Sequence, residues 1–316
     1  MILKSYAKLN LYLAVLNKRK DNYHNIETLF ERIDLHDTII LKKLPDNTIK
    51  IICSHPDVPA DASNLCYKSA KLLQDNCAVN CGVEIKITKR IPVAAGLGGG
   101  SSNAASTLIG LNKLWRLGFS KDKLAQLGRL IGADVPFFIM NTPFAIATGR
   151  GDKIKPLARI NKARLWHILA VPGIKVSTPL IYKEWDSRCL RNNRGKPWLT
   201  HSTSLRVNSE IKGKTIEELT KPLGDVKLLP SVIIGNKLFC RPDLLYNGLE
   251  EATVRLYPEV KRIKKRLTDL GVQAVRMSGS GPAVFGIVAS KRDALCLAGS
   301  LKKQDRSLKV FVISTW

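Results

Sequence analysis

The sequence predicts an α+β fold, and three stretches of the chain carry this prediction. Residues 7–15 alternate between apolar and polar side chains, as a half-buried strand does. Residues 85–115 run from a strand pattern through a glycine-rich loop into a helical pattern. Residues 258–313 follow the order helix, strand, turn, strand, helix and strand. No internal repeat or low-complexity segment interrupts this order.

The first predicted strand has one apolar and one polar face. The apolar face consists of Ala7, Leu9, Leu11, Leu13 and Val15. Because successive side chains of a strand point to opposite faces, Lys8 and Asn10 are expected to project side by side, away from the core. Ser120 is expected to cap a later helix. The other elements predicted in this half are strands at 38–41, 49–53, 83–88 and 144–148 and helices at 63–74 and 120–131, the latter with Leu124, Leu127, Leu130 and Ile131 on one face.

The loop within Pro92–Ala105 is expected to bind an anion, because it leads from a strand into a helix N-terminus. Glycines let backbone amides approach a phosphate, and the helix start offers unpaired N–H groups and a positive dipole end. Ser101 or Ser102 is the expected N-cap. The loop lacks the lysine of a Walker A motif and the third glycine of a dinucleotide fingerprint. The alternative is a flexible turn that happens to be rich in glycine.

The C-terminal half continues with a strand at 165–171. Residues 187–215 are polar and basic, and they are expected to form a long loop or an insertion between the two halves. Pro258 is expected to start a helix that Gly271 closes. That helix is predicted to turn Val260, Ile263, Leu267 and Leu270 inward.

Composition limits the class of protein. A chain of 316 residues, 45% of them hydrophobic, can form one large or two medium domains. No apolar run approaches the length of about 18 residues that a membrane span needs. The chain enters a strand pattern at once, without a signal segment, so a cytoplasmic protein is expected. Its seven cysteines are expected to be reduced thiols, and Cys77 and Cys81 lack the partners of a zinc site.

The net charge of +25 is unusually high. It is compatible with nucleic acid, an anionic membrane, a polyanionic small substrate, or a solvated basic surface. The basic residues are spread along the chain without interleaved aromatic residues, which argues against nucleic acid.

Three short motifs could carry chemistry. Asp134, within Gly132–Pro136, is a candidate general base for phosphoryl transfer, and Lys8 is a candidate partner that would keep its carboxylate ionised. An aspartate before a Val-Pro step is more often a helix cap or a turn residue. Tyr23 and His24 could stack on and hydrogen-bond a nucleobase, although such a pair usually packs at a surface. The turn Ser278–Pro282 could close over a phosphate or serve only as a hairpin turn.

Together these motifs resemble the GHMP kinase superfamily, which includes galactokinase, homoserine kinase and mevalonate kinase. The first strand, the segment Pro92–Ala105 and the segment Met277–Ala283 match its three motifs. The N-terminal part of the chain resembles one family within this superfamily more closely. It looks like the 4-diphosphocytidyl-2-C-methyl-D-erythritol kinases of the non-mevalonate isoprenoid pathway in the segments Ala7–Leu13, Asp21–Asn25, Glu27–Phe30 and Leu35–Thr38.

The resemblance implies a two-domain fold with the active site in the cleft between the lobes. The expected domains are 1–160, on the ATP side, and 161–316, on the substrate side. It also implies transfer of the γ-phosphate of ATP, with Mg²⁺, to the 2-hydroxyl of 4-diphosphocytidyl-2-C-methyl-D-erythritol, a cytidine diphosphate derivative of methylerythritol. Lys8 and Asp134 would form the catalytic pair. The expected substrate contacts are Asn10, Tyr23, His24 and Tyr182, with Tyr23 and Tyr182 sandwiching the cytosine ring.

On the ATP side, the resemblance places Asn64 towards the adenine and the glycine-rich loop around the phosphates. The loop residues concerned are Pro92, Gly96, Leu97, Gly98, Gly99, Gly100, Ser101 and Ser102. No carboxylate is identified as a metal ligand, so Mg²⁺ is expected on ATP oxygens, water and one serine hydroxyl. The partner is expected to be a small molecule, with no nucleic acid or membrane, and the chain to be a monomer or weak homodimer. The alternatives are a GHMP kinase of the homoserine or mevalonate type and a basic nucleic-acid-binding protein.

Overall fold

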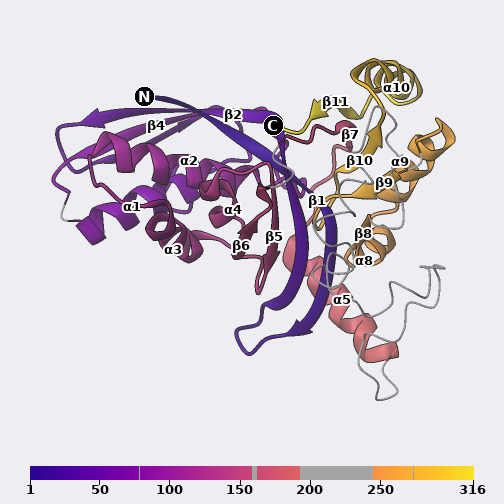
Figure 1. The fold of residues 1–316 in the computed structure, drawn as a ribbon, viewed down its shortest axis with the longest axis horizontal. Helices are drawn as coiled ribbons and strands as arrows, with labels where there is room; N and C mark the ends of the chain where they lie inside the picture. The colour runs from indigo at the N-terminus through magenta and orange to yellow at the C-terminus, as the bar shows by residue number, and fades with distance from the viewer. Residues whose placement is uncertain (78, 159–161, 193–244, 273) are drawn as a thin grey trace.

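The computed structural model describes residues 1–77, 79–158, 162–192, 245–272 and 274–316. It contains two sheets, each with helices packed on it (Figure 1). The strands of the first, seven-stranded sheet are β1 (Ile2–Lys18), β2 (His24–Leu44), β3 (Ile49–Cys53), β4 (Gly82–Thr88), β5 (Phe144–Thr148), β6 (Lys153–Pro156) and β8 (Tyr246–Asn247). Those of the second, four-stranded sheet are β7 (Trp166–Val171), β9 (Ala274–Met277), β10 (Val284–Val288) and β11 (Lys309–Ser314).

The first sheet is organised around a long antiparallel hairpin of β1 and β2. Its central strands follow the order β3-β4-β2-β1-β8, and β5 and β6 continue from β2. In this register Lys8 is opposite Arg32, and Asn10 is opposite Phe30. Strand β8, which lies late in the chain, pairs in parallel with β1 at Tyr12 and Leu13. The C-terminal half therefore contributes a strand to the N-terminal sheet.

Helices cover one face of each sheet. The first sheet carries α1 (Leu65–Cys77), α2 (Gly99–Leu114), α3 (Lys121–Ile131) and α4 (Val135–Met140). The second carries α5 (Thr178–Asn192), α8 (Glu250–Leu256), α9 (Pro258–Asp269) and α10 (Lys291–Gln304). Figure 1 shows these two helical layers on opposite sides of the molecule, with the β1–β2 hairpin reaching between them towards α5.

Three apolar clusters form the core. One joins α1–α4 to the first sheet, and a second joins α5 and α8–α10 to the second sheet. The third lies between the sheets and includes Leu9, Ile33, Leu169 and Phe285. Burial of these side chains is the main favourable contribution to folding, and the third cluster extends it across the junction of the two lobes.

Most predicted elements are confirmed. The strand at 49–53 coincides with β3, and the strand at 144–148 coincides with β5. Ser120 caps α3 by accepting a hydrogen bond from the backbone N–H of Lys123. Pro258 starts α9, and Gly271 follows its end in the left-handed conformation with φ +87°. The domain boundary near residue 160 stays a prediction.

Four expectations are wrong or lie beyond the described residues. Neither Ser101 nor Ser102 caps α2, because the helix starts from Gly98, whose left-handed φ of +69° places both serines inside the helix. Leu130 is 72% exposed rather than on the inward face of α3. Lys8 and Asn10 do lie side by side, but both are buried, so the strand is covered on both faces. Of the stretch 187–215, residues 187–192 extend α5, and the remainder is not among the described residues.

Among the described residues, no helix is both long and apolar enough to cross a membrane. Six cysteines of that part of the chain are free thiols, as expected, and Cys240 lies outside it.

Candidate active site

A cavity of about 880 Å³ lies between the two lobes. The first strand, the glycine-rich loop, the start of α4, the helix α5 and the second glycine turn all contribute to its lining. Lys8, Asn10, Tyr23, His24 and Asp134 line it. So do the other predicted site residues Asn64, Pro92, Gly96, Leu97, Gly98, Gly99, Gly100, Ser101 and Tyr182. The fold thus brings into one cavity residues that are far apart in the sequence.

Lys8 and Asp134 meet inside this cavity, which the sequence alone could not show. The Lys8 ammonium nitrogen is 3.7 Å from a carboxylate oxygen of Asp134. The ammonium also donates a hydrogen bond of 2.5 Å to the Asn10 side-chain oxygen. Burial lowers the pKa of Lys8 below the ordinary lysine value, and the carboxylate of Asp134 offsets part of this effect. The pair is therefore an electrostatically coupled acid and base at the junction of the lobes.

Asp134 is not used as a helix cap. It occupies the N-cap position of α4, yet its side chain makes no capping hydrogen bond. The side chain is 29% exposed and faces the cavity and Lys8. This geometry favours the chemical interpretation of Asp134 over the capping interpretation, because its carboxylate remains accessible to a ligand.

The glycine-rich loop packs directly on the second glycine turn. Gly96 has a φ of +76°, and a methyl group placed on it would lie 2.2 Å from the carbonyl oxygen of Ser278. The Ser278 hydroxyl donates a hydrogen bond of 3.1 Å to the Gly96 carbonyl, and the Ala283 N–H donates one of 3.3 Å to the Ala95 carbonyl. The two turns, one from each half of the chain, therefore form a single backbone surface beside the cavity.

Ser102 differs from the other predicted loop residues. It is buried, and its hydroxyl accepts a hydrogen bond of 2.8 Å from Ser5 instead of lining the cavity. Asn64 lines the cavity while it caps α1, because its side-chain oxygen accepts from the Cys66 N–H at 2.8 Å. Its amide nitrogen donates to the carbonyl oxygen of Pro59.

Lys89 is a cavity residue that the motif analysis missed. Its buried ammonium forms an ion pair with Asp37 and lies 3.1 Å from the position of a methyl group built on Gly99. Asp37 also accepts hydrogen bonds from the backbone N–H groups of Arg90 and Ile91, at 2.7 and 2.8 Å. Asp37 belongs to the Leu35–Thr38 segment, which the family resemblance had already singled out. Nothing in the sequence, however, linked that segment to Lys89 or to the glycine-rich loop. Asp37 thus holds the Lys89 ammonium near the start of α2, where the positive charge of Lys89 adds to the positive end of the helix dipole.

The other end of the cavity is aromatic. The His24 ring stacks on Tyr182 with a centroid separation of 4.9 Å and an interplanar angle of 23°. Burial, with a contribution from the charge of Asp134, raises the pKa of the Tyr182 phenol. Tyr23 is 53% exposed, and the Arg150 guanidinium lies 5.0 Å from the centre of its ring. The structure thus stacks Tyr182 on His24 and places Arg150 on Tyr23, and the enclosure of a cytosine ring by Tyr23 and Tyr182 stays a prediction.

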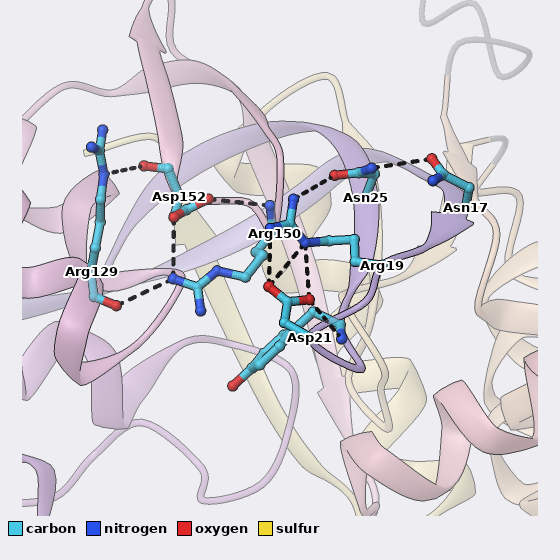
Figure 2. Close-up of polar contacts among 8 residues, drawn as sticks. Asn17, Arg19, Asp21, Asn25, Arg129, Arg150 and Asp152 are labelled. Carbon is cyan, nitrogen blue, oxygen red and sulfur yellow. Dashed lines mark hydrogen bonds and ion pairs between the residues drawn. The ribbon is translucent and has the colours of Figure 1, made fainter.

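Polar contacts fix the hairpin turn that carries Tyr23 (Figure 2). Arg19 donates to Asp21 and to Asn25, and Arg150 donates to Asp152. Figure 2 shows the groups around Arg19 and Arg150 lying next to each other. The turn of the hairpin and the loop after β5 therefore meet at the rim of the cavity.

Helix α5 also contributes Asp186, which the sequence analysis did not identify. Its carboxylate accepts a hydrogen bond of 2.6 Å from His24 Nε2 and one of 2.7 Å from the Lys18 ammonium. His24 and Asp186 are 162 positions apart in the chain, so no local pattern could have paired them. In the described part of the chain, no group of three or more His, Cys, Asp or Glu residues is arranged to hold a metal ion.

Comparisons with known proteins agree with this geometry. The model of the GHMP kinases N terminal domain matches residues 64–142, and that of the GHMP kinases C terminal domain matches residues 234–304. A 4-diphosphocytidyl-2-C-methyl-D-erythritol kinase of Geobacillus sp. (strain WCH70) is 44% identical over 91% of this chain and 88% of that protein. One of Shouchella clausii (strain KSM-K16) is 43% identical over 90% of this chain and 85% of that protein.

Solved structures show the same relationship. A crystal structure of 4-(cytidine 5'-diphospho)-2C-methyl-D-erythritol kinase matches with a TM-score of 0.71 and 30% identity, over 99% of this chain and 98% of the other. The mevalonate kinase of Methanococcus jannaschii matches with a TM-score of 0.68 over 100% of this chain and 98% of the other, but at 16% identity, which reflects a shared fold alone. The chain therefore belongs to the GHMP kinases and, within them, to the family of 4-diphosphocytidyl-2-C-methyl-D-erythritol kinases.

Proposed function

We propose that this enzyme transfers the γ-phosphate of ATP to the 2-hydroxyl of 4-diphosphocytidyl-2-C-methyl-D-erythritol, a step of non-mevalonate isoprenoid synthesis. The observation that carries the proposal is the Lys8–Asp134 pair, which lies in a cavity between a phosphate-type loop and an aromatic end. The family relationship of the chain supports the choice of substrate.

In the proposed reaction, the acceptor oxygen forms a bond to the γ-phosphorus while the bond to the β–γ bridging oxygen breaks and ADP leaves. Asp134 accepts the proton of the acceptor hydroxyl. Lys8, whose ammonium is 3.7 Å from Asp134, orients that hydroxyl and stabilises the negative charge that develops on it. Positioning and electrostatics are sufficient for such a transfer, so no phosphoenzyme is required.

The loop from Gly96 to Ser101 is proposed to hold the ATP phosphates, with Asn64 towards the adenine. Its backbone N–H groups at the start of α2, together with the Lys89 ammonium, form a suitable anion site. Mg²⁺ bound with ATP would neutralise charge on the phosphates. The donors on this side are hydroxyl and amide groups of Ser101 and Asn103, which is compatible with a metal held mainly by ATP oxygens and water.

The aromatic end is proposed to hold the cytosine, with Tyr23, His24 and Tyr182 as its contacts and Asn10 nearer the diphosphate. A ring held between aromatic groups and hydrogen-bonded at its edge is a common way to bind a nucleobase. Neither homoserine nor mevalonate contains a group that this end of the cavity would recognise, so the aromatic end favours the cytidine substrate over these two.

The test is turnover of Asp134→Asn, with ADP detection and this cytidine substrate as the sole acceptor. We expect turnover to fall by roughly 10²–10⁴-fold, the usual contribution of a general base, with ATP affinity almost unchanged. Asp75→Asn is the matched control, because Asp75 is an exposed carboxylate that forms an ion pair of 2.7 Å with its helix neighbour Lys71. Loss of ATP binding in the Asp134 variant would show a structural role instead. If the unmodified enzyme turned over homoserine or mevalonate but not the cytidine substrate, the proposed substrate would be refuted.

A further inference from the structure

Asp186 holds two basic groups of the hairpin at the edge of the cavity. One carboxylate oxygen accepts from His24 Nε2 at 2.6 Å, and the other accepts from the Lys18 ammonium at 2.7 Å. Burial alone would raise the pKa of Asp186, but the hydrogen bonds from Lys18 and His24 outweigh it and lower that pKa. The carboxylate therefore stays ionised and can only accept hydrogen bonds at the pH of a kinase assay.

The ring of His24 has little freedom to turn. Its side chain is 4% exposed. Tyr182 stacks on one face of the ring, and Trp185 contacts it edge-on with a centroid separation of 5.3 Å. These two aromatic residues and Asp186 all come from α5. A single helix thus sets both the plane of the imidazole and the partner of its Nε2 atom.

The identity of that partner determines which ring nitrogen of a neutral imidazole carries the proton. An ionised carboxylate cannot donate, so Nε2 bears the hydrogen and Nδ1 is left as an acceptor. Nδ1 of His24 has no hydrogen-bond partner among the described residues, and His24 lines the cavity. The ring therefore offers an acceptor to a ligand.

We propose that Asp186 is a positioning residue that fixes this tautomer of His24 and thereby makes the site select a nucleobase with an exocyclic amino group. The proposal rests on the proposed function, in which this end of the cavity binds the nucleobase. The 4-amino group of cytosine donates a hydrogen bond, which Nδ1 can accept. Uracil has a carbonyl oxygen at the same position, and two facing acceptors would leave both groups unpaired in a buried site.

The test compares the selectivity for cytidine over uridine in the unmodified enzyme and in Asp186→Asn. The amide of asparagine can donate as well as accept, so it no longer imposes one tautomer. We expect the ratio of kcat/KM for the cytidine and uridine forms of the substrate to fall by roughly 10- to 100-fold, because the penalty for an unpaired buried group is lost. The loss is expected in KM, with kcat almost unchanged, because Asp186 does not touch the reacting atoms.

Two variants separate this role from a purely structural one. Lys18→Met breaks the ion pair of Lys18 with Asp186 but leaves the Asp186 carboxylate on His24, so it should keep the selectivity. Asp269→Asn, an exposed carboxylate paired with Lys265 on α9, controls for the change of charge. A loss of selectivity in Lys18→Met as large as that in Asp186→Asn would overturn the proposal, because anchoring of the hairpin would then be the cause.

Nitrogen-15 NMR of the His24 ring reads the tautomer directly. The unmodified enzyme should show a protonated Nε2 and an unprotonated Nδ1, and Asp186→Asn should show a mixture. Two protonated nitrogens in the unmodified enzyme at pH 8 would overturn the proposal. Calorimetric titration with CMP and UMP separates this outcome from failure of the proposed function. If the unmodified enzyme binds neither, the assignment of the nucleobase site fails. If it prefers CMP and Asp186→Asn keeps the same preference, only the role of Asp186 fails.

Discussion

Replacing Gly96 with alanine should damage both stability and catalysis, for a reason that the geometry makes quantitative. The residue has a φ of +76°, a conformation that costs an L-residue with a Cβ about 1–2 kcal/mol. The new methyl carbon would lie 2.2 Å from the carbonyl oxygen of Ser278. Because that oxygen belongs to the backbone, no rotamer change relieves the overlap, and one of the two turns must move.

That movement would weaken the contacts between the turns. They include the Ser278 hydroxyl bond to the Gly96 carbonyl, at 3.1 Å, and the Ala283 N–H bond to the Ala95 carbonyl, at 3.3 Å. Each such bond contributes about 1 kcal/mol net. With the backbone term, Gly96→Ala should lower the free energy of unfolding by roughly 3–4 kcal/mol. It should also reduce kcat, because in the proposed function the loop holds the phosphate in line with Asp134.

Gly118→Ala is the matched control for this experiment. Gly118 has a φ of +71°, close to that of Gly96, but a methyl group there would meet no atom within 4 Å. Gly118→Ala should therefore lower the free energy of unfolding only by the cost of the left-handed backbone conformation, about 1–2 kcal/mol, and leave the kinetics unchanged. Urea unfolding of both variants measures the stability difference, and single-turnover kinetics measure the chemical step. Equal stability losses in the two variants, or a normal kcat in Gly96→Ala, would refute the role of the contact with Ser278.

Two further predictions concern the folded state. Lys8→Met should abolish turnover and lower the free energy of unfolding at pH 7 by about 1–3 kcal/mol, because the buried Asn10 oxygen loses its donor and Asp134 loses its counter-ion. The folded-state pKa of Lys8 lies below the ordinary 10.5, so the unfolded chain binds more protons between the two values, and the stability of the unmodified protein relative to Lys8→Met should rise as the pH rises through that window. Urea titrations at pH 7 and 10 test this, and a Lys8→Met variant as stable as the unmodified protein would contradict it. Ser120→Ala should lose about 1 kcal/mol, because the hydroxyl no longer accepts the Lys123 N–H; an unchanged urea midpoint would mean that water replaces the cap.

Local patterns predicted most of the elements and pointed to Lys8 and Asp134 as candidates, but they could not show which parts of the chain cover each element. The period-two alternation located β1 correctly, and it placed Lys8 and Asn10 on the polar face. These residues are nevertheless buried, because the glycine-rich loop lies against the Lys8 side chain at Gly98 and the Ser278–Pro282 turn lies against Asn10. The serine cap of α2 failed for a different reason. Gly98 adopts a left-handed conformation that lets the backbone enter the helix without a side-chain cap.

The aromatic end of the site was the least predictable part. Tyr23 and His24 were identified from the chemistry of their side chains and Tyr182 only from the family resemblance. The arrangement of the three depends on how α5 packs against the hairpin. The contact of His24 with Asp186 joins two segments that share no sequence pattern. Such a pair arises only from tertiary packing. The conformation of the glycine-rich loop, in contrast, is determined largely by consecutive residues, so it can be recognised in the sequence.

The two halves of the chain meet at the points where the site is built, and this arrangement has a consequence for how the protein can function. The Gly96–Ser278 contact, the His24–Asp186 pair and the buried hydrogen bond between His167 and Glu31, at 2.9 Å, each join the first lobe to the second. The first two border the cavity, and Ala95 and Leu97 of the apolar cluster between the sheets also line it. Neither half alone contains both the glycine-rich loop and the turn that supports it. Loosening the junction should therefore impair catalysis before it unfolds either core, since sub-ångström placement of the phosphate depends on contacts that each contribute only about 1 kcal/mol.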